Sequence, residues 1–117
     1  MSDVIIIYHN PACGASRNTL ALLREKGVEP KVVEYVKAGW TRAQLEGLLK
    51  TMGVRAREIM RVQGTRADEL GLTDPAATDA ALLAAMVVDP LLVNRPIVVT
   101  PKGAALCRPA ERVLDLI

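Results

Sequence analysis

One cysteine near the start of the chain lies where chemistry would be expected. Cys13 belongs to residues 9–17, HNPACGASR, between a short apolar run and a segment of helical character. Unpaired backbone N–H groups and the positive end of the dipole at a helix start favour an anion, either the Cys13 thiolate or an oxyanion substrate beside it. The alternative is an inert buried cysteine. Because Asn, Pro, Gly and Ser are poor packing residues, we predict a reactive thiol.

No second thiol lies next to this one. Ser16 stands where a Cys-x-x-Cys redox pair would have its second cysteine, so a reductant for Cys13 must come from elsewhere. Cys107 could be a packed strand residue or a second redox thiol; we favour the packed role, because nothing in the sequence brings it to Cys13. One His and two Cys without ligand spacing predict no metal site.

Basic residues are the candidate partners of the thiol. His9, the only histidine, could act as a general base, as an electrostatic modulator of the thiolate, or as a solvated loop residue. Arg17 could turn toward the loop or lie on the surface. Three more arginines lie next to the ends of predicted elements. Arg61 ends a helical stretch, Arg95 directly precedes Pro96, and Arg108 directly follows the last strand. Each alone could be a surface residue, but their planar guanidinium groups suit tetrahedral oxyanions and stabilise thiolates.

The elements that would position these residues begin with a strand, a helix and a strand. The apolar residues 4–8 predict a strand, a helix should run from Cys13 or Gly14 to a stop at Gly27, and the β-branched residues 31–36 predict a second strand. This order predicts a right-handed βαβ unit with two parallel strands.

A helical insertion of about residues 41–88 follows. It should contain a helix with a capping box at residues 41–44 that ends at Gly53, a helical stretch over 56–60, a turn of helix over 67–70, and a helix capped by Thr78. Residues 97–100 and 104–107 then predict an antiparallel hairpin, and Pro109 suits the first position of a last helix.

This order of elements predicts an α/β chain with a thioredoxin-like fold: a four-stranded mixed sheet with a helical insertion between the second and third strands. Pro96 stands where that fold keeps a cis proline, and the residue before that proline faces the nucleophilic cysteine. We predict a single domain spanning residues 1–117.

Composition limits the partners. Aromatic residues make up 3% of the chain and the net charge is +2, which argues against a nucleic-acid surface. The apolar run of residues 4–7 follows Asp3 rather than a basic segment, so it predicts neither a signal peptide nor a membrane span, and we expect a cytoplasmic protein.

Three stretches resemble the glutaredoxin-dependent arsenate reductases: residues 9–20 (HNPACGASRNTL), 94–101 (NRPIVVTP) and 106–109 (LCRP). The similarity covers essentially the whole chain, and the sequence ends at Ile117, where longer family members carry an additional C-terminal tail. The resemblance implies that Cys13 attacks arsenate, that Arg61, Arg95 and Arg108 bind the oxyanion, and that His9 tunes the thiol. Further substrate contacts are expected from Asn10, Gly14, Ser16, Arg17 and Pro96.

The family's route implies a Cys13 thiol–arsenate ester, glutathione as co-substrate and glutaredoxin as the partner that releases arsenite, with no bound cofactor. Two alternatives stay open. A thiol-transfer enzyme could use the arginines to hold glutathione carboxylates. A redox-sensing regulator that binds RNA polymerase resembles this fold, although such regulators usually use the Cys-x-x-Cys pair that Ser16 interrupts.

Overall fold

The chain folds into two compact units. The computed structural model describes residues 4–117. The expectation about an N-terminal leader used Asp3, which lies outside the described residues. Residues 4–38 and 95–117 form one unit, here the sheet unit, and residues 39–94 form the other, the helical unit. The single domain stays a prediction. Among residues 4–117, no helix is both long and apolar enough to cross a membrane.

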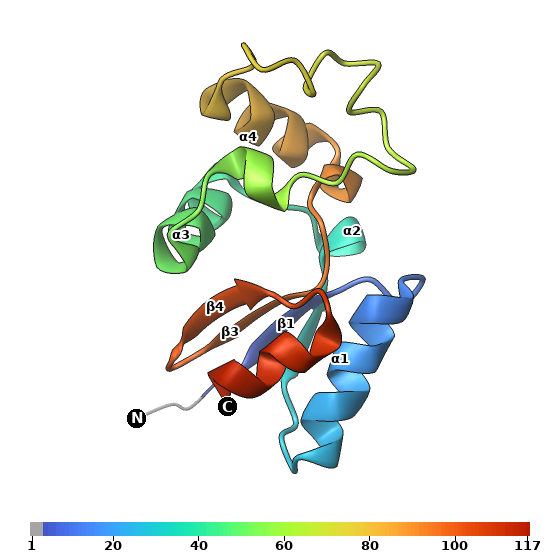
Figure 1. The fold of residues 1–117 in the computed structure, drawn as a ribbon, viewed down its shortest axis with the longest axis vertical. Helices are drawn as coiled ribbons and strands as arrows, with labels where there is room; N and C mark the ends of the chain where they lie inside the picture. The colour runs from blue at the N-terminus through green and yellow to red at the C-terminus, as the bar shows by residue number, and fades with distance from the viewer. Residues whose placement is uncertain (1–3) are drawn as a thin grey trace. The chain divides into compact units, whose positions relative to one another are not determined.

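The sheet unit contains four strands and three helical segments (Figure 1). In chain order they are β1 (Ile6–His9), α1 (Gly14–Glu25), β2 (Lys31–Glu34), α2 (Tyr35–Ala38), β3 (Ile97–Thr100), β4 (Gly103–Leu106) and the 3-10 helix η3 (Ala110–Leu116).

The strands form one mixed sheet in the order β2-β1-β3-β4. β1 is parallel to β2 and antiparallel to β3, so that Ile7 lies opposite Val32 on one side and Val98 on the other. β3 and β4 form an antiparallel hairpin. These pairings confirm the thioredoxin-like topology, with the βαβ unit at one end of the chain and the ββα unit at the other.

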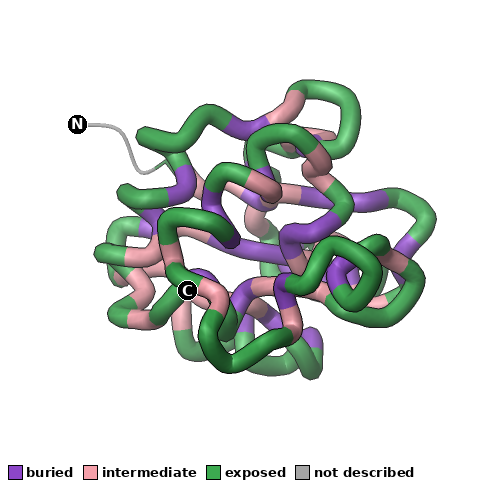
Figure 2. Tube along the Cα trace, turned by 90° about the horizontal axis from the view of Figure 1, so that it is seen from above, coloured by how far each residue is buried: buried purple, intermediate pink, exposed green. Residues whose placement is uncertain are grey.

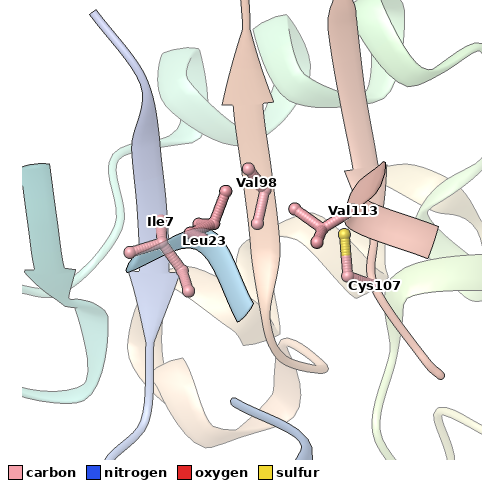
Figure 3. Close-up of a cluster of buried hydrophobic side chains, with 5 residues drawn as sticks. All are labelled: Ile7, Leu23, Val98, Cys107 and Val113. Atoms are coloured by element: carbon pink, nitrogen blue, oxygen red, sulfur yellow. The ribbon is translucent and has the colours of Figure 1, made fainter. Parts of the chain in front are cut away.

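The core of this unit lies between the sheet and two helical segments. Figure 1 shows α1 and η3 side by side, and the buried side chains of Ile7, Leu23, Val98, Cys107 and Val113 cluster beneath them (Figure 3). The burial class changes many times along the chain, as the bands along the tube in Figure 2 show, and β3 is the most buried of the strands. This packing holds β1 and α1 together, and with them the loop that carries Cys13.

The second strand is shorter than predicted. It ends at Glu34, and Tyr35 begins the single helical turn α2. The ring of Tyr35 is only 1% exposed, whereas Val36 is 40% exposed. The β-branched pattern continues through Val36 and therefore did not reveal this change.

Other element ends differ by one or two residues. β1 begins at Ile6 rather than at residue 4, and β4 covers Gly103–Leu106 because Gly103 pairs with Thr100 to close the hairpin. Pro109 lies at the N-cap of η3 rather than at its first position. The peptide bonds before Pro109 and before Pro96 are both cis, which confirms the expectation for Pro96.

The helical unit is built from two helices and two 3-10 turns: α3 (Arg42–Met52), η1 (Ala56–Ile59), α4 (Asp79–Val88) and η2 (Pro90–Leu92). The predicted capping box is present, because the Thr41 hydroxyl accepts from Gln44 N and the Gln44 side chain accepts from Thr41 N. Gly53 ends α3 with φ 68°, and the Thr78 side chain caps α4. This unit extends beyond the predicted 41–88 at both ends.

The predicted turn of helix at 67–70 is met only by a single i→i−4 turn, in which Leu70 N donates to the Arg66 carbonyl at 2.9 Å, and no regular helix lies between Arg61 and Thr78. The segment runs through hydrogen-bonded turns between Gly64 and Gly71, both with positive φ, and is too short to repay helix nucleation. The prediction of a 56–60 helix is met only by the 3-10 turn η1.

One side chain braces this segment. The Arg57 guanidinium donates to the carbonyl oxygens of Leu72, Asp74 and Ala77 at 3.5, 3.1 and 3.0 Å. Three backbone acceptors that no regular element uses are thereby satisfied by one cation.

Candidate active site

Cys13 lies at the N-terminus of α1, as the sequence predicted. It is the N-cap residue, with extended backbone at φ −97° and ψ 124°, and its carbonyl accepts the first helical bond from Arg17 N at 3.0 Å. No acidic residue lies in the first turn of the helix. The positive end of the helix dipole therefore faces the thiol without a competing carboxylate.

Asn10 shapes the loop before the helix. Its backbone carbonyl accepts from Cys13 N at 2.9 Å, and its Oδ1 accepts from Ala12 N at 3.0 Å. Asn10 is only 8% exposed. These bonds close the turn and set the position from which the Cys13 side chain projects.

Ser16 binds the loop from inside. Its Oγ lies 2.6 Å from His9 Nδ1 and accepts from Asn10 N at 3.1 Å, and Ser16 has no exposed surface. The sequence placed Ser16 among the substrate-binding residues. Its hydroxyl makes contacts within the loop, and its backbone N–H contacts the Cys13 sulfur. Substrate binding by Ser16 stays a prediction.

His9 is buried and its pKa is lowered. Burial is the largest cause; Glu34, which pairs with His9 across β1 and β2, opposes it, while Arg24 and Arg17 add to the lowering. The lowered pKa favours the neutral imidazole. With Nδ1 held by Ser16, His9 acts on the loop that positions Cys13, and its predicted role as a general base stays a prediction.

The Cys13 thiol is activated by hydrogen bonds. Burial alone would raise its pKa, but the backbone N–H of Ser16, the side chains of Arg95 and Arg108, and the backbone N–H of Ala15 together lower the pKa from 9.0 to about 7. The contact from Arg108 Nη1 to the sulfur measures 3.5 Å. A large fraction of the thiol is thus thiolate at neutral pH.

Arg108 makes a second contact with the same nitrogen. Nη1 donates to the backbone carbonyl of Arg95 at 3.0 Å. Arg95 itself precedes the cis Pro96, whose carbonyl accepts from Cys107 N at 2.9 Å. The cis proline, the hairpin and Arg108 are therefore joined into one support beside the sulfur.

Two other predicted site residues lie in the first turn of α1 with defined contacts. Arg17 folds back so that its Nη1 donates to the Pro11 carbonyl at 2.8 Å. Gly14 is the first residue of α1, and a Cβ there would meet Arg17 Nη2 at 3.7 Å, an ordinary contact distance. Their role in substrate binding stays a prediction.

Arg61 belongs to the helical unit. Its Nε donates to the Gln63 carbonyl at 3.1 Å and its Nη1 to Asn94 Oδ1 at 3.3 Å. Asn94 is the neighbour of Arg95 in the sequence. The predicted contact of Arg61 with the oxyanion stays a prediction.

Cys107 is packed. It has no exposed surface, its sulfur lies next to Val113 within the core (Figure 3), and burial raises its pKa to about 11. Arg112 partly opposes this rise, and Asp115 adds to it. Both cysteines are free thiols.

Sequence reasoning did not identify two kinds of group in this site. The backbone N–H groups of Ala15 and Ser16 contact the sulfur, a contact that the general rule for helix starts indicates without naming residues. The second group is the backbone carbonyl of Arg95, which accepts from Arg108. Every residue carries a backbone carbonyl, so residue types do not show which carbonyl will be the acceptor.

The arrangement suits attack of a thiolate on a tetrahedral oxyanion. In such an attack the sulfur would be the nucleophile, and the guanidinium groups of Arg95 and Arg108 beside it could offset charge on the oxyanion. Within residues 4–117, no three His, Cys, Asp or Glu side chains gather to hold a metal ion.

The chain is similar to proteins of a known family. Residues 8–116 match the ArsC family. A protein of Rhizobium meliloti named arsenate reductase is 53% identical over 113 residues, which cover 97% of this chain and 81% of that protein. An Escherichia coli protein of the same name is 47% identical over 97% of this chain and 80% of its own length.

A solved structure shares the fold throughout. The arsenate reductase from Vibrio cholerae superposes with a TM-score of 0.93 at 39% sequence identity, and the match covers all of both chains. With a family match over nearly its whole length, relatives at about half identity and a shared fold, the chain belongs to the ArsC family.

Proposed function

We propose that this protein reduces arsenate to arsenite, with glutathione and glutaredoxin as the reductants. The observation that carries the proposal is the Cys13 thiol, with a pKa of about 7 and Arg108 at 3.5 Å from its sulfur. The relatives named arsenate reductase support the substrate.

The first step is attack of the Cys13 thiolate on arsenic(V). A sulfur–arsenic bond forms, and one arsenate oxygen leaves as water after it takes up protons. Arg108 and Arg95 offset the charge on the remaining oxygens. Arg61 is proposed as the third guanidinium that contacts the oxyanion.

The two electrons come from two external thiols. Glutathione attacks the arsenic and adds a second sulfur–arsenic bond, releasing a second oxygen as water. A glutaredoxin thiolate then attacks the glutathione sulfur, so that this sulfur leaves in a mixed disulfide and its bonding pair stays on arsenic as As(III). Hydrolysis of the Cys13–arsenic bond releases arsenite. The cycle uses no bound cofactor, and its dependence on glutathione fits a cytoplasmic protein.

The test is arsenate-dependent oxidation of NADPH, coupled through glutathione, glutaredoxin and glutathione reductase. We expect turnover by the wild type and none by Cys13→Ser. Cys107→Ala is the matched control, because it removes the other thiol and should keep the activity. Absence of arsenate dependence in the wild type would exclude the proposal. Turnover of glutathione mixed disulfides in its place would favour the thiol-transfer alternative.

A further inference from the structure

We propose that Arg17 binds a carboxylate of the reducing thiol, glutathione, and so brings the glutathione sulfur to Cys13. This role rests on the proposed function in one respect, that glutathione is the reductant. It gives the reductant a binding group of its own, separate from the arginines that contact the Cys13 sulfur.

Arg17 lies one helical turn after Cys13, and its side chain reaches back over the loop. Its backbone N–H donates to the Cys13 carbonyl at 3.0 Å, and its Nη1 donates to the Pro11 carbonyl at 2.8 Å. A Cβ added to Gly14 would lie 3.7 Å from Nη2 of Arg17. Pro11, Gly14 and Arg17 are all exposed. The guanidinium is therefore held at the solvent-facing rim of the loop that carries the thiol.

No neighbouring carboxylate neutralises the charge of Arg17. Within residues 4–117 no Asp or Glu forms an ion pair with it, and the first turn of α1 carries no acidic residue. Arg24, two turns further along α1, shows the contrast, because its Nε and Nη2 hold the Glu29 carboxylate at 3.1 to 3.3 Å.

The edge that Arg24 uses for Glu29 is open in Arg17. The hydrogen bond of Arg17 to Pro11 uses Nη1, and Nε and Nη2 donate to no acceptor among the described residues. Nε–H and Nη2–H of a guanidinium lie parallel and match the two oxygens of a carboxylate. Arg17 therefore presents a two-donor edge, already oriented by Pro11, to an anion from solution.

The position of this edge fits glutathione better than arsenate. The side chains that hydrogen-bond the Cys13 sulfur are those of Arg95 and Arg108, and that of Arg17 is not among them. The oxygens of an arsenic atom bonded to this sulfur lie next to the same two arginines. Glutathione instead carries its carboxylates several bonds from its sulfur, so one of them can bind at the rim while the sulfur attacks.

Oxidised glutathione tests the contact without arsenate. The Cys13 thiolate attacks one sulfur of this disulfide, and the sulfur–sulfur bond breaks. One glutathione leaves as a thiolate, and the other stays in a mixed disulfide with Cys13. No further oxidant or reductant takes part, and the glutathione that is bound carries the same carboxylates as in the arsenate cycle.

Three disulfides separate recognition of the carboxylate from other effects of a substitution. They are oxidised glutathione, its tetraethyl ester, in which the carboxylates are uncharged, and bis(2-hydroxyethyl) disulfide, which has none. Second-order rate constants would be measured by mass spectrometry of the intact protein. Each rate is divided by that of bis(2-hydroxyethyl) disulfide with the same variant, which cancels changes in the thiolate content of Cys13.

We expect the normalised rate with oxidised glutathione to fall about 5- to 10-fold in Arg17→Ala, the effect of one lost charged contact, and the rate with the ester to stay within about twofold. Arg17→Lys keeps the charge without the two-donor edge and should lie between Arg17→Ala and wild type. Arg24→Ala is the matched control, because it removes an equal charge from the same helix, and both of its normalised rates should stay within about twofold of wild type.

The arsenate assay provides a second readout, with glutaredoxin and glutathione reductase in excess. Arg17→Ala should raise the KM for glutathione about 5- to 10-fold, leave kcat unchanged and keep the KM for arsenate within about twofold. A loop that is merely disturbed would change the KM for both substrates, and that result would overturn the role of Arg17.

An unchanged normalised rate in Arg17→Ala would also overturn this role, and so would an equal fall with the ester or an equal fall in Arg24→Ala. Failure of the proposed function has a different signature. A wild type without arsenate turnover would remove that function, while the rates with the three disulfides would still report whether Arg17 binds the glutathione carboxylate.

Discussion

The hydroxyl oxygen of Ser16 and Nδ1 of His9 lie 2.6 Å apart inside the loop that carries Cys13. Both residues are buried, and Asn10 N donates to the same oxygen. One hydroxyl therefore ties the end of β1 to the first turn of α1. The position of the thiol depends on this bond, although neither residue's side chain is what lowers the Cys13 pKa.

Replacing Ser16 with Ala should destabilise the protein by about 1–3 kcal/mol, because buried His9 and Asn10 groups lose their partner. Urea denaturation measures the change. Thr51→Ala is the control, since its exposed hydroxyl donates only to the Gly47 carbonyl and its loss should cost about 0.5 kcal/mol or less. Equal stability of the two variants would show that the buried bond contributes nothing.

The rate of Cys13 alkylation by iodoacetamide should rise with pH around a midpoint of about 7, below the ordinary value of 9.0. In Arg108→Ala the midpoint should move upward, because one of the groups that stabilise the thiolate is gone. The rates are obtained by quenching the alkylation at set times and measuring the alkylated fraction of the Cys13 peptide by mass spectrometry. A wild-type midpoint at the ordinary value would contradict the activated thiolate.

Acidification should weaken the fold through His9. The unfolded chain binds a proton on histidine at about pH 6.5, whereas the native pKa is lower, with burial the largest cause. As pH falls through that value, the unfolded state takes up a proton that the native state does not, so the free energy of unfolding decreases.

This acid effect is measured by urea denaturation between about pH 7 and pH 5. His9→Gln is the comparison, because it removes the titrating group, and its stability should depend less on pH in this window. If both proteins lose stability with the same slope, His9 is not the group responsible.

Arg57→Ala should destabilise the helical unit by about 1–2 kcal/mol, since three loop carbonyls lose a charged donor. Arg55→Ala provides a matched control two residues away. The Arg55 guanidinium pairs with Asp79 at 3.4 Å, and both side chains are exposed, so its loss should cost about 0.5 kcal/mol or less. The two variants would be compared by thermal unfolding, and an equal loss in both would argue against a bracing role for Arg57.

The parts of the fold that sequence reasoning predicted carry local signals. The capping box at Thr41 and Gln44 satisfies orphan backbone groups within four residues, and Gly27 stops α1 through its own φ of 79°. The place of Cys13 at a helix start follows from such signals too. The sheet topology could be predicted because a βαβ unit and a short hairpin are compatible with only a few arrangements of four strands.

The parts that it missed depend on distant partners. The second strand gives way to a helical turn at Tyr35, whose side chain is buried, and no pattern of β-branched neighbours reveals this change. The contact of the Ser16 hydroxyl with His9, seven residues earlier, was not predicted, because residue type alone does not show which group a hydroxyl meets. Arg108 also donates to the backbone carbonyl of Arg95. A backbone acceptor cannot be identified from residue types, because every residue has one.

Because Cys107 is buried in the native state, the reactivity of its thiol reports unfolding of the protein. Cys13 keeps 8% exposure and has a pKa lowered to about 7, while Cys107 has no exposed surface and a pKa of about 11. Native protein should therefore titrate as a single equivalent of thiol with a disulfide reagent and as two after unfolding. The slow appearance of the second equivalent would time the opening of the packing between the sheet and η3, without any label having to be introduced.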